Sequence, residues 1–267
     1  MAVRDIALGR FVLVDSPVHD LDPRTKIIST IALTIALFSS DSALVLAICG
    51  AVTLLAAARS HIPARLLLRS LGPFLWLFSF TFLLHAVLTP GQALWYLPAF
   101  DISFTREGIA YGLLLCSRLV IAISLASLMT LTTTPMELTN ALERLLRPLR
   151  RCGFPAHEFT MMVTISIRFI PVLLDEAERL HKAQLSRGAD FGGSLLQRAR
   201  QMVPLIVPLF VSAFDRADRL ALAMESRAYG CGIARTSFRE LCFRRRDLVA
   251  AATTGISVIA IIMFDAL

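Results

Sequence analysis

The stretch DEAERLHKAQLSRG (Asp175–Gly188) has a near-copy forty residues later, DRADRLALAMESRA (Asp215–Ala228). The two copies agree at seven of fourteen positions, which are Asp, Ala, Arg, Leu, Ala, Ser and Arg in that order. Two copies are too few for a solenoid, which needs about three repeats to bury a continuous core. We therefore interpret the repeat as one device that the chain uses twice, and each copy as the end of a helix.

Each copy closes a segment that is apolar in its first half and charged in its second. The apolar halves are Phe159–Leu174 and Met202–Phe214. Sixteen helical residues rise only about 24 Å, whereas a bilayer core is about 30 Å thick. The halves also contain Pro171, Pro204 and Pro208, which disrupt regular hydrogen bonding. The pattern predicts two kinked helices lying against the membrane face or partner helices, with their charged halves in the cytoplasm.

Local signals place three helix starts in the region that holds the repeat. TPME (Thr134–Glu137) reads as an N-cap threonine, a proline at the first helical position and a capping-box glutamate. An apolar stripe follows, and Pro148 is expected to stop this helix near Arg147. GFPAHE (Gly153–Glu158) and SLLQ (Ser194–Gln197) start the two longer helices.

The composition predicts a membrane protein. Of 267 residues, 56% are hydrophobic and 18% are charged, whereas soluble domains have about 25% charged residues. We expect an all-α polytopic membrane protein with about five transmembrane helices and a cytoplasmic helical module. The expected divisions are residues 1–133 (an N-terminal cytoplasmic segment and four spans), 134–246 (cytoplasmic helices) and 247–267 (the last span). The five candidate spans are Lys26–Ser39, Ser42–Ala58, Leu71–Leu88, Gly108–Leu131 and Leu248–Phe264.

The charge distribution sets the expected orientation. With the N-terminus inside, 25 of the 27 lysines and arginines lie on the cytoplasmic side, as the positive-inside rule favours. Arg106 alone lies outside, and Arg118 lies mid-span. The formal charge of +7 therefore indicates contact with the inner leaflet of the lipid bilayer or with a cytoplasmic protein, and no nucleic acid partner is expected.

Motifs for catalysis and metal binding are missing from the sequence. Neither lysine, Lys26 nor Lys182, stands in a phosphate-binding P-loop. HEFTM (His157–Met161) has methionine where a zinc-protease helix needs its second histidine, and the five histidines do not cluster. No Gly-x-Ser-x-Gly is present. We expect no enzyme activity, no metal site and no cofactor in this chain, so any ATP-derived energy must come from another chain.

Two features have both a structural and a functional interpretation. Each Ser-Arg motif is either a helix C-terminal cap, with a basic side chain favouring the macrodipole, or a docking tip, with a rigid guanidinium suited to a partner's groove. Arg118 either pairs internally, or has a functional role in holding the bundle together or facing a substrate-binding partner, because an ionised residue mid-span usually has a partner.

The chain resembles the transmembrane T components of energy-coupling factor (ECF) transporters. The resemblance covers nearly the whole sequence. It rests on ALGRFVLVDSPVHDLDPRTKI (Ala7–Ile27), LTTTPMELTNALERLLRPL, PAHEFTMMVTISIRFIPVLLDE, KAQLSRGADF and RADRLALAMESRAYG, in this order. It implies that the two short motifs correspond to the family's paired Ala-Arg-Gly signatures, which insert into two cytoplasmic ATPases. The residues so implied are Ser186, Arg187, Gly188, Ser226, Arg227 and Ala228.

The resemblance also implies the rest of the assembly. Two ABC-type ATPases would bind ATP and Mg, a separate membrane (S) subunit would bind a vitamin or transition-metal ion, and the complex would lie in a prokaryotic inner membrane. The chain departs from the signatures with serine for alanine in both and with Ala228 for glycine. We therefore expect the third cytoplasmic helix to continue through Ala228 and to end at Gly230.

Two other interpretations have their own tests. An ordinary ABC importer permease would hold its own substrate path and bind substrate unaided, but such permeases usually carry one coupling loop per chain. An intramembrane hydrolase would cleave a model peptide or lipid and lose this activity through one point substitution. The transported substrate does not follow from the sequence.

Overall fold

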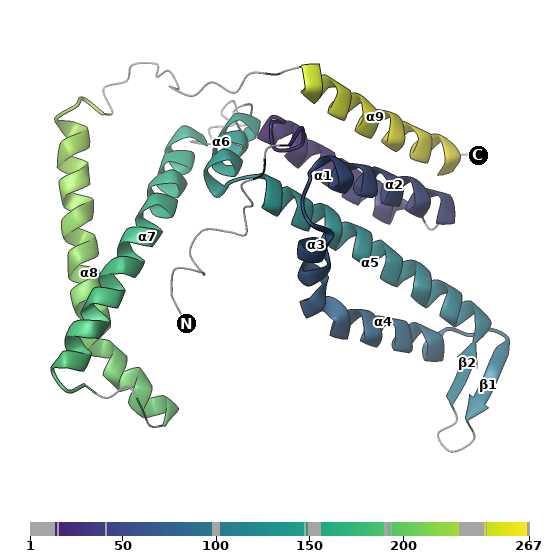
Figure 1. The fold of residues 1–267 in the computed structure, drawn as a ribbon, viewed down its shortest axis with the longest axis horizontal. Helices are drawn as coiled ribbons and strands as arrows, with labels where there is room; N and C mark the ends of the chain where they lie inside the picture. Colours follow the sequence, from purple (N-terminus) through teal and green to yellow (C-terminus); the bar gives the residue numbers. More distant parts are fainter. Residues whose placement is uncertain are drawn as a thin grey trace. The chain divides into compact units, whose positions relative to one another are not determined.

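The computed structural model describes residues 14, 16–40, 42–97, 102–146, 148, 156–189, 192, 194–229, 243 and 245–265. Its elements up to the first strands are α1 (Pro23–Ser39), α2 (Ala43–Arg59), α3 (Ala64–Leu71), the 3-10 turn η2 (Gly72–Phe74), α4 (Leu75–Leu88), β1 (Ala93–Leu97) and β2 (Ile102–Thr105). Then follow α5 (Arg106–Thr132), α6 (Pro135–Leu146), α7 (Ala156–Ser186), α8 (Leu195–Glu225) and α9 (Arg245–Asp265), as Figure 1 shows.

The described residues form two compact units. The bundle unit takes its residues from 9–145 and 241–267, and the crossed-helix unit takes its residues from 146–240. The second unit is therefore an insertion between α6 and α9 of the first. The units divide later in the chain than the boundary expected at residue 134, because α6 belongs to the bundle unit, where its Ala141 is fully buried.

The core of the bundle unit joins helices from both ends of the chain. Leu33, Leu37, Val45, Leu125 and Ile261 are buried together and come from α1, α2, α5 and α9. A second cluster of Ile62, Leu128 and Leu131 fixes the turn before α3 against the end of α5. Large apolar side chains on the outer faces of these helices are exposed, as expected of surfaces that contact lipid.

The prediction of a helical membrane protein is confirmed. Within the described residues, three helical segments have the length and composition to cross a membrane: Ala64–Leu88, Arg106–Thr132 and Arg245–Phe264. The other two expected spans are α1 and α2, which have 17 residues each and therefore rise about 26 Å. The count of five spans stays a prediction.

An antiparallel hairpin between α4 and α5 departs from the expected all-α fold. β1 pairs with β2 from Leu97 opposite Ile102 to Ala93 opposite Thr105, with an irregularity between Ala93 and Trp95. Thr105 ends the hairpin and caps α5, since its Oγ1 accepts from Gly108 N (3.1 Å) and donates to Thr89 O (2.7 Å). The hairpin thereby holds α4 against the start of α5 (Figure 1).

Two glycines permit this contact of α4 with α5. A Cβ at Gly108 would lie 2.5 Å from the backbone oxygen of His85 and 3.2 Å from the Cα of Ala86. A Cβ at Gly112 would lie 3.2 Å from the Phe82 ring. The two helices therefore approach closely at a glycine pair spaced four residues apart, as small residues permit in membrane helices.

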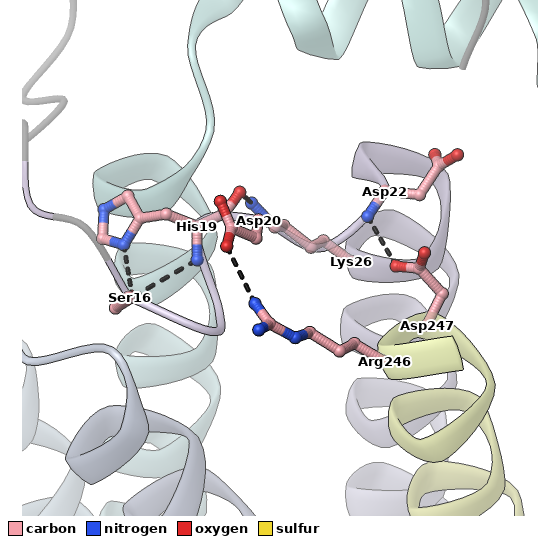
Figure 2. A network of polar contacts seen from close by, with 7 residues as sticks. All are labelled: Ser16, His19, Asp20, Asp22, Lys26, Arg246 and Asp247. Carbon is pink, nitrogen blue, oxygen red and sulfur yellow. Dashed lines mark hydrogen bonds and ion pairs between the residues drawn. The ribbon is translucent and has the colours of Figure 1, made fainter. Parts of the chain in front are cut away.

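A polar network ties α1 to α5 and α9, and Figure 2 shows the contacts at α9. Asp22, the N-cap of α1, donates its backbone N–H to Asp247 Oδ1 (2.6 Å), and Asp20 pairs with Arg246 (2.9 Å). Lys26 Nζ is buried and donates to the carbonyl oxygens of His19 (3.0 Å) and Thr132 (2.9 Å). Because Thr132 is the last residue of α5, the ammonium group lies at the negative end of that helix.

The crossed-helix unit consists of the two long helices that precede the Ser-Arg motifs. α7 and α8 contact each other and cross (Figure 1). The capping box at Ser194 and Gln197 is confirmed, and so is the one at Thr134 and Glu137 at the start of α6 in the bundle unit. Pro171 lies inside α7, and Pro204 and Pro208 lie inside α8, so the helices continue through these residues.

Candidate functional site

α7 ends in a Schellman motif built around Arg187. The N–H of Ala189 donates to Gln184 O (3.0 Å), and the N–H of Gly188 donates to Leu185 O (3.0 Å). Gly188 has φ +84°, the left-handed conformation that this motif requires after the cap residue. Arg187 is therefore the C-cap, and its side chain leaves the helix where the backbone reverses direction.

α8 ends in the same motif forty residues later. The N–H of Tyr229 donates to Met224 O (2.9 Å), and the N–H of Ala228 donates to Glu225 O (2.9 Å). Arg227 is the residue corresponding to Arg187, and its N–H donates to Met224 O (3.1 Å), as that of Arg187 does to Gln184 O (3.1 Å). The repeat in the sequence is thus a repeat in three dimensions.

The expectation that α8 continues through Ala228 is wrong. α8 ends at Glu225, and Ala228 itself has φ +58°. The left-handed region is unfavourable for alanine by about 1–2 kcal/mol, and the cap hydrogen bonds of Arg227, Ala228 and Tyr229 offset this strain. Gly230, the residue expected to end the helix, lies outside the described residues.

Exchanging alanine and glycine at the two caps should have opposite effects. Gly188→Ala should weaken its cap, although no atom lies within 4 Å of the added Cβ, because alanine is strained at this φ. Ala228→Gly should relieve the same strain. We expect amide hydrogen exchange at Ala189 to be about threefold to tenfold faster in the first variant, and exchange at Tyr229 to be slower by a similar factor in the second.

Hydrogen-exchange mass spectrometry of the detergent-solubilised chain measures both changes. Each helix end serves as the control for the other, because a substitution at one cap should leave the exchange of the other unchanged. Slower exchange in Gly188→Ala, or faster exchange in Ala228→Gly, would contradict the assignment of these conformations.

All six residues of the two motifs are exposed. The hydroxyl groups of Ser186 and Ser226 donate back to the helix carbonyls of Lys182 and Ala223 (3.0 Å each). Among the described residues, neither the Arg187 nor the Arg227 guanidinium has an ion pair or a side-chain hydrogen bond. Since backbone groups complete both caps, each guanidinium keeps its planar fork of donors for carboxylate or carbonyl acceptors.

Arg118, the other candidate, lies in the bundle unit. It is 6% exposed, its Nη2 donates to Ser40 O (2.6 Å), and its guanidinium carbon lies 5.8 Å from the centroid of the Phe38 ring. Ser40 is the C-cap of α1, so the cation lies at the negative end of that helix. This geometry holds α1 against α5. A role of Arg118 in transport stays a prediction.

Comparisons with known proteins identify the family. The family model described as cobalt transport protein (CbiQ) matches residues 15–237. The energy-coupling factor transporter transmembrane protein EcfT of Thermanaerovibrio acidaminovorans is 47% identical over 261 residues, covering 97% of this chain and 96% of that protein. The chain belongs to the family of energy-coupling factor transmembrane proteins. As such a T component, it is the membrane coupling subunit of an ECF transporter.

Relatives from other bacteria show the same relation. EcfT of Acidaminococcus fermentans is 45% identical over 258 residues, covering 96% of this chain and 94% of that protein. EcfT of Bacillus subtilis is 38% identical over 261 residues, covering 96% of each. The similarity therefore extends over both units of this T component, and it does not favour an ordinary importer permease.

Proposed function

We propose that this T component couples two cytoplasmic ABC-type ATPases to a separate substrate-binding membrane subunit. The two motifs dock into the ATPases, Ser186–Gly188 through Arg187 and Ser226–Ala228 through Arg227. ATP-driven closure of the ATPases moves α7 and α8, and these helices move the substrate-binding subunit between loading and release. The transported substrate is a vitamin or a transition-metal ion.

One observation carries this proposal: two exposed arginines occupy the same position in two identical helix caps. A duplicated tip suits a partner that presents the same groove twice, such as a pair of ATPase subunits. The apolar halves of the helices support the second contact. Met202, Ile206, Phe210 and Phe214 of α8 are exposed large apolar side chains, a surface typical of protein or membrane contact.

The partners can be identified directly. Mass spectrometry of proteins that co-purify with the tagged full-length chain from its own host should find two ABC-type ATPase subunits, identical or different, and one small membrane protein. Small molecules extracted from the purified complex should co-purify with this membrane protein and should be absent when it is removed. A purified chain that binds substrate by itself would contradict the proposal and favour an ordinary permease.

The proposal places the crossed-helix unit in the cytoplasm of a prokaryotic cell, beneath the inner membrane. In a cysteine-free background, a cysteine at exposed Gln92, between α4 and β1, should react with a membrane-impermeant maleimide in intact cells. A cysteine at exposed Ala183 in α7 should react only after permeabilisation, because the lysines and arginines concentrate on its side of the membrane. The reverse pattern would contradict the orientation and the docking proposal with it.

A further inference from the structure

An ion pair joins the two crossed helices at equivalent positions of the repeat. Arg216 Nη2 of α8 lies 3.5 Å from Glu176 Oε2 of α7. Both residues are second in their fourteen-residue copies, where one copy has glutamate and the other has arginine. A local two-fold axis between two copies brings equivalent positions into contact where the axis passes, and this ion pair is a contact of that kind. The helices therefore cross at corresponding points.

The burial pattern along the helices agrees with this local symmetry. Each α8 position that the structure describes as half-buried has a half-buried counterpart forty residues earlier in α7. On either side of the ion pair these positions include Leu209, Ala213 and Leu220 of α8, and Phe169, Leu173 and Leu180 of α7. The half-buried face of α8 thus has its counterpart on α7, which is also half-buried at further positions such as Ile167 and Ala177, whose counterparts Val207 and Ala217 are exposed.

The ion pair lies equally far along the chain from both arginine tips. Arg187 follows Glu176 by eleven residues, and Arg227 follows Arg216 by the same interval. We call the segment from the ion pair to each arginine an arm, so the arms are residues 176–187 and 216–227. Eleven helical residues correspond to a rise of about 16 Å along each arm. A slip of one helix along the other by a single turn would make the arms unequal by about 5.4 Å, and the two tips would no longer match two equivalent grooves.

We propose that the Glu176–Arg216 pair is the pivot of the crossed helices, which sets their register and keeps the two arms equal. The side chains are 24% and 38% exposed, so the pair contributes little to stability. The pair instead selects one register of α7 against α8. Equivalent positions face each other at a two-fold contact, so two copies with the same charged residue there would repel each other. Opposite charges at this one position of the repeat remove that repulsion. The proposal rests on the docking function proposed above.

Spin labels near the tips can test the pivot. In a cysteine-free full-length chain, labels at Ala183 and Ala223, which are exposed and equivalent, report the distance between the arms by pulsed electron resonance. We expect one narrow distribution in the unsubstituted chain. Glu176→Arg and Arg216→Glu should each broaden it about twofold, because like charges then face each other across the crossing. The double exchange should restore the narrow distribution.

Asp218→Arg is the matched control. Asp218 is exposed on α8 two residues after Arg216, and its replacement reverses the charge without facing α7, so the distribution should stay narrow. The proposed pivot would be overturned if the distance distribution stayed narrow in both single variants, or if it stayed broad in the double variant.

The same samples separate the pivot from the proposed function. Co-expressed ATPases should bind the control and double-exchange chains as well as the unsubstituted chain. They should be retained less by both single variants, whose tips no longer match the two grooves, and ATP with vanadate should shift the distance only in the unsubstituted, control and double-exchange chains. If no ATPase binds the unsubstituted chain, the docking function fails, whereas the distributions of the chain alone still decide whether the charges set the register. A shift that persists in both single variants would contradict the pivot.

Discussion

Replacing both Arg187 and Arg227 by alanine should nearly abolish the retention of ATPases on the tagged chain. Truncating an arginine at the centre of an interface often weakens binding by about 2 kcal/mol or more. Each single change should therefore reduce retention by about tenfold or more. The two contacts also reinforce each other through effective concentration, which can raise avidity by about 10²–10⁴, and the double variant loses this gain as well.

The structure separates this result from a simple loss of helix capping. Backbone N–H groups make the hydrogen bonds of both caps, so alanine at Arg187 or Arg227 should lower stability by no more than about 1 kcal/mol through the helix dipole. Lysine should restore that loss, because the dipole responds to charge. It should restore little docking, because an ammonium group lacks the planar fork.

The measurement is the amount of ATPase retained, together with the melting temperature of the purified chain. Full retention by the double alanine variant would contradict docking. A loss of melting temperature that lysine rescues together with retention would instead support the capping interpretation.

Gly108→Ala should be the most destabilising of the conservative substitutions in the bundle unit. The new Cβ would lie 2.5 Å from His85 O and 2.6 Å from Thr105 Oγ1, so α4 and α5 would have to separate or the Thr105 cap would have to break. Overpacking of this kind destabilises by about 1–3 kcal/mol. We expect a melting temperature lower by about 5 °C or more.

Gly255→Ala in α9 is the matched control for this substitution. No atom lies within 4 Å of a Cβ at Gly255, and alanine is favoured over glycine in a helix by up to about 1 kcal/mol. Its melting temperature should be unchanged or higher. Equal shifts in the two variants would show that the close contact at Gly108 does not limit stability.

The features that the sequence predicted well are local ones. The caps at Thr134 and Ser194 form as expected, because each depends on residues only three positions apart. The paired helix ends were also predictable as a repeat. The hairpin had a signal that could have been used, since ALWYL and ISFT are rich in aromatic and β-branched residues.

The features that the sequence could not supply depend on distant partners. Lys26 is the first residue of the candidate span Lys26–Ser39, and the sequence does not show that its side chain is buried at the end of α5, where its Nζ donates to Thr132 O. Glu176 and Arg216 are one of the differences between the two copies in the sequence, whereas in the structure they form an ion pair between α7 and α8. The prediction for Ala228 was wrong because it followed from the preference of alanine for negative φ. The backbone hydrogen bonds of the cap hold this residue at φ +58° instead.

The contact of Asp22 with Asp247 spans 225 positions of the sequence, and it sets an order of events during translation. The ribosome completes α1 early and reaches α9 only after α7 and α8 have been made. The bundle unit therefore closes around Ile261 and Asp247 after the crossed helices have already left the exit tunnel. A chain that ends after α8 would carry both arginines but would lack Ile261 and Asp247, so the core of the bundle unit would stay incomplete.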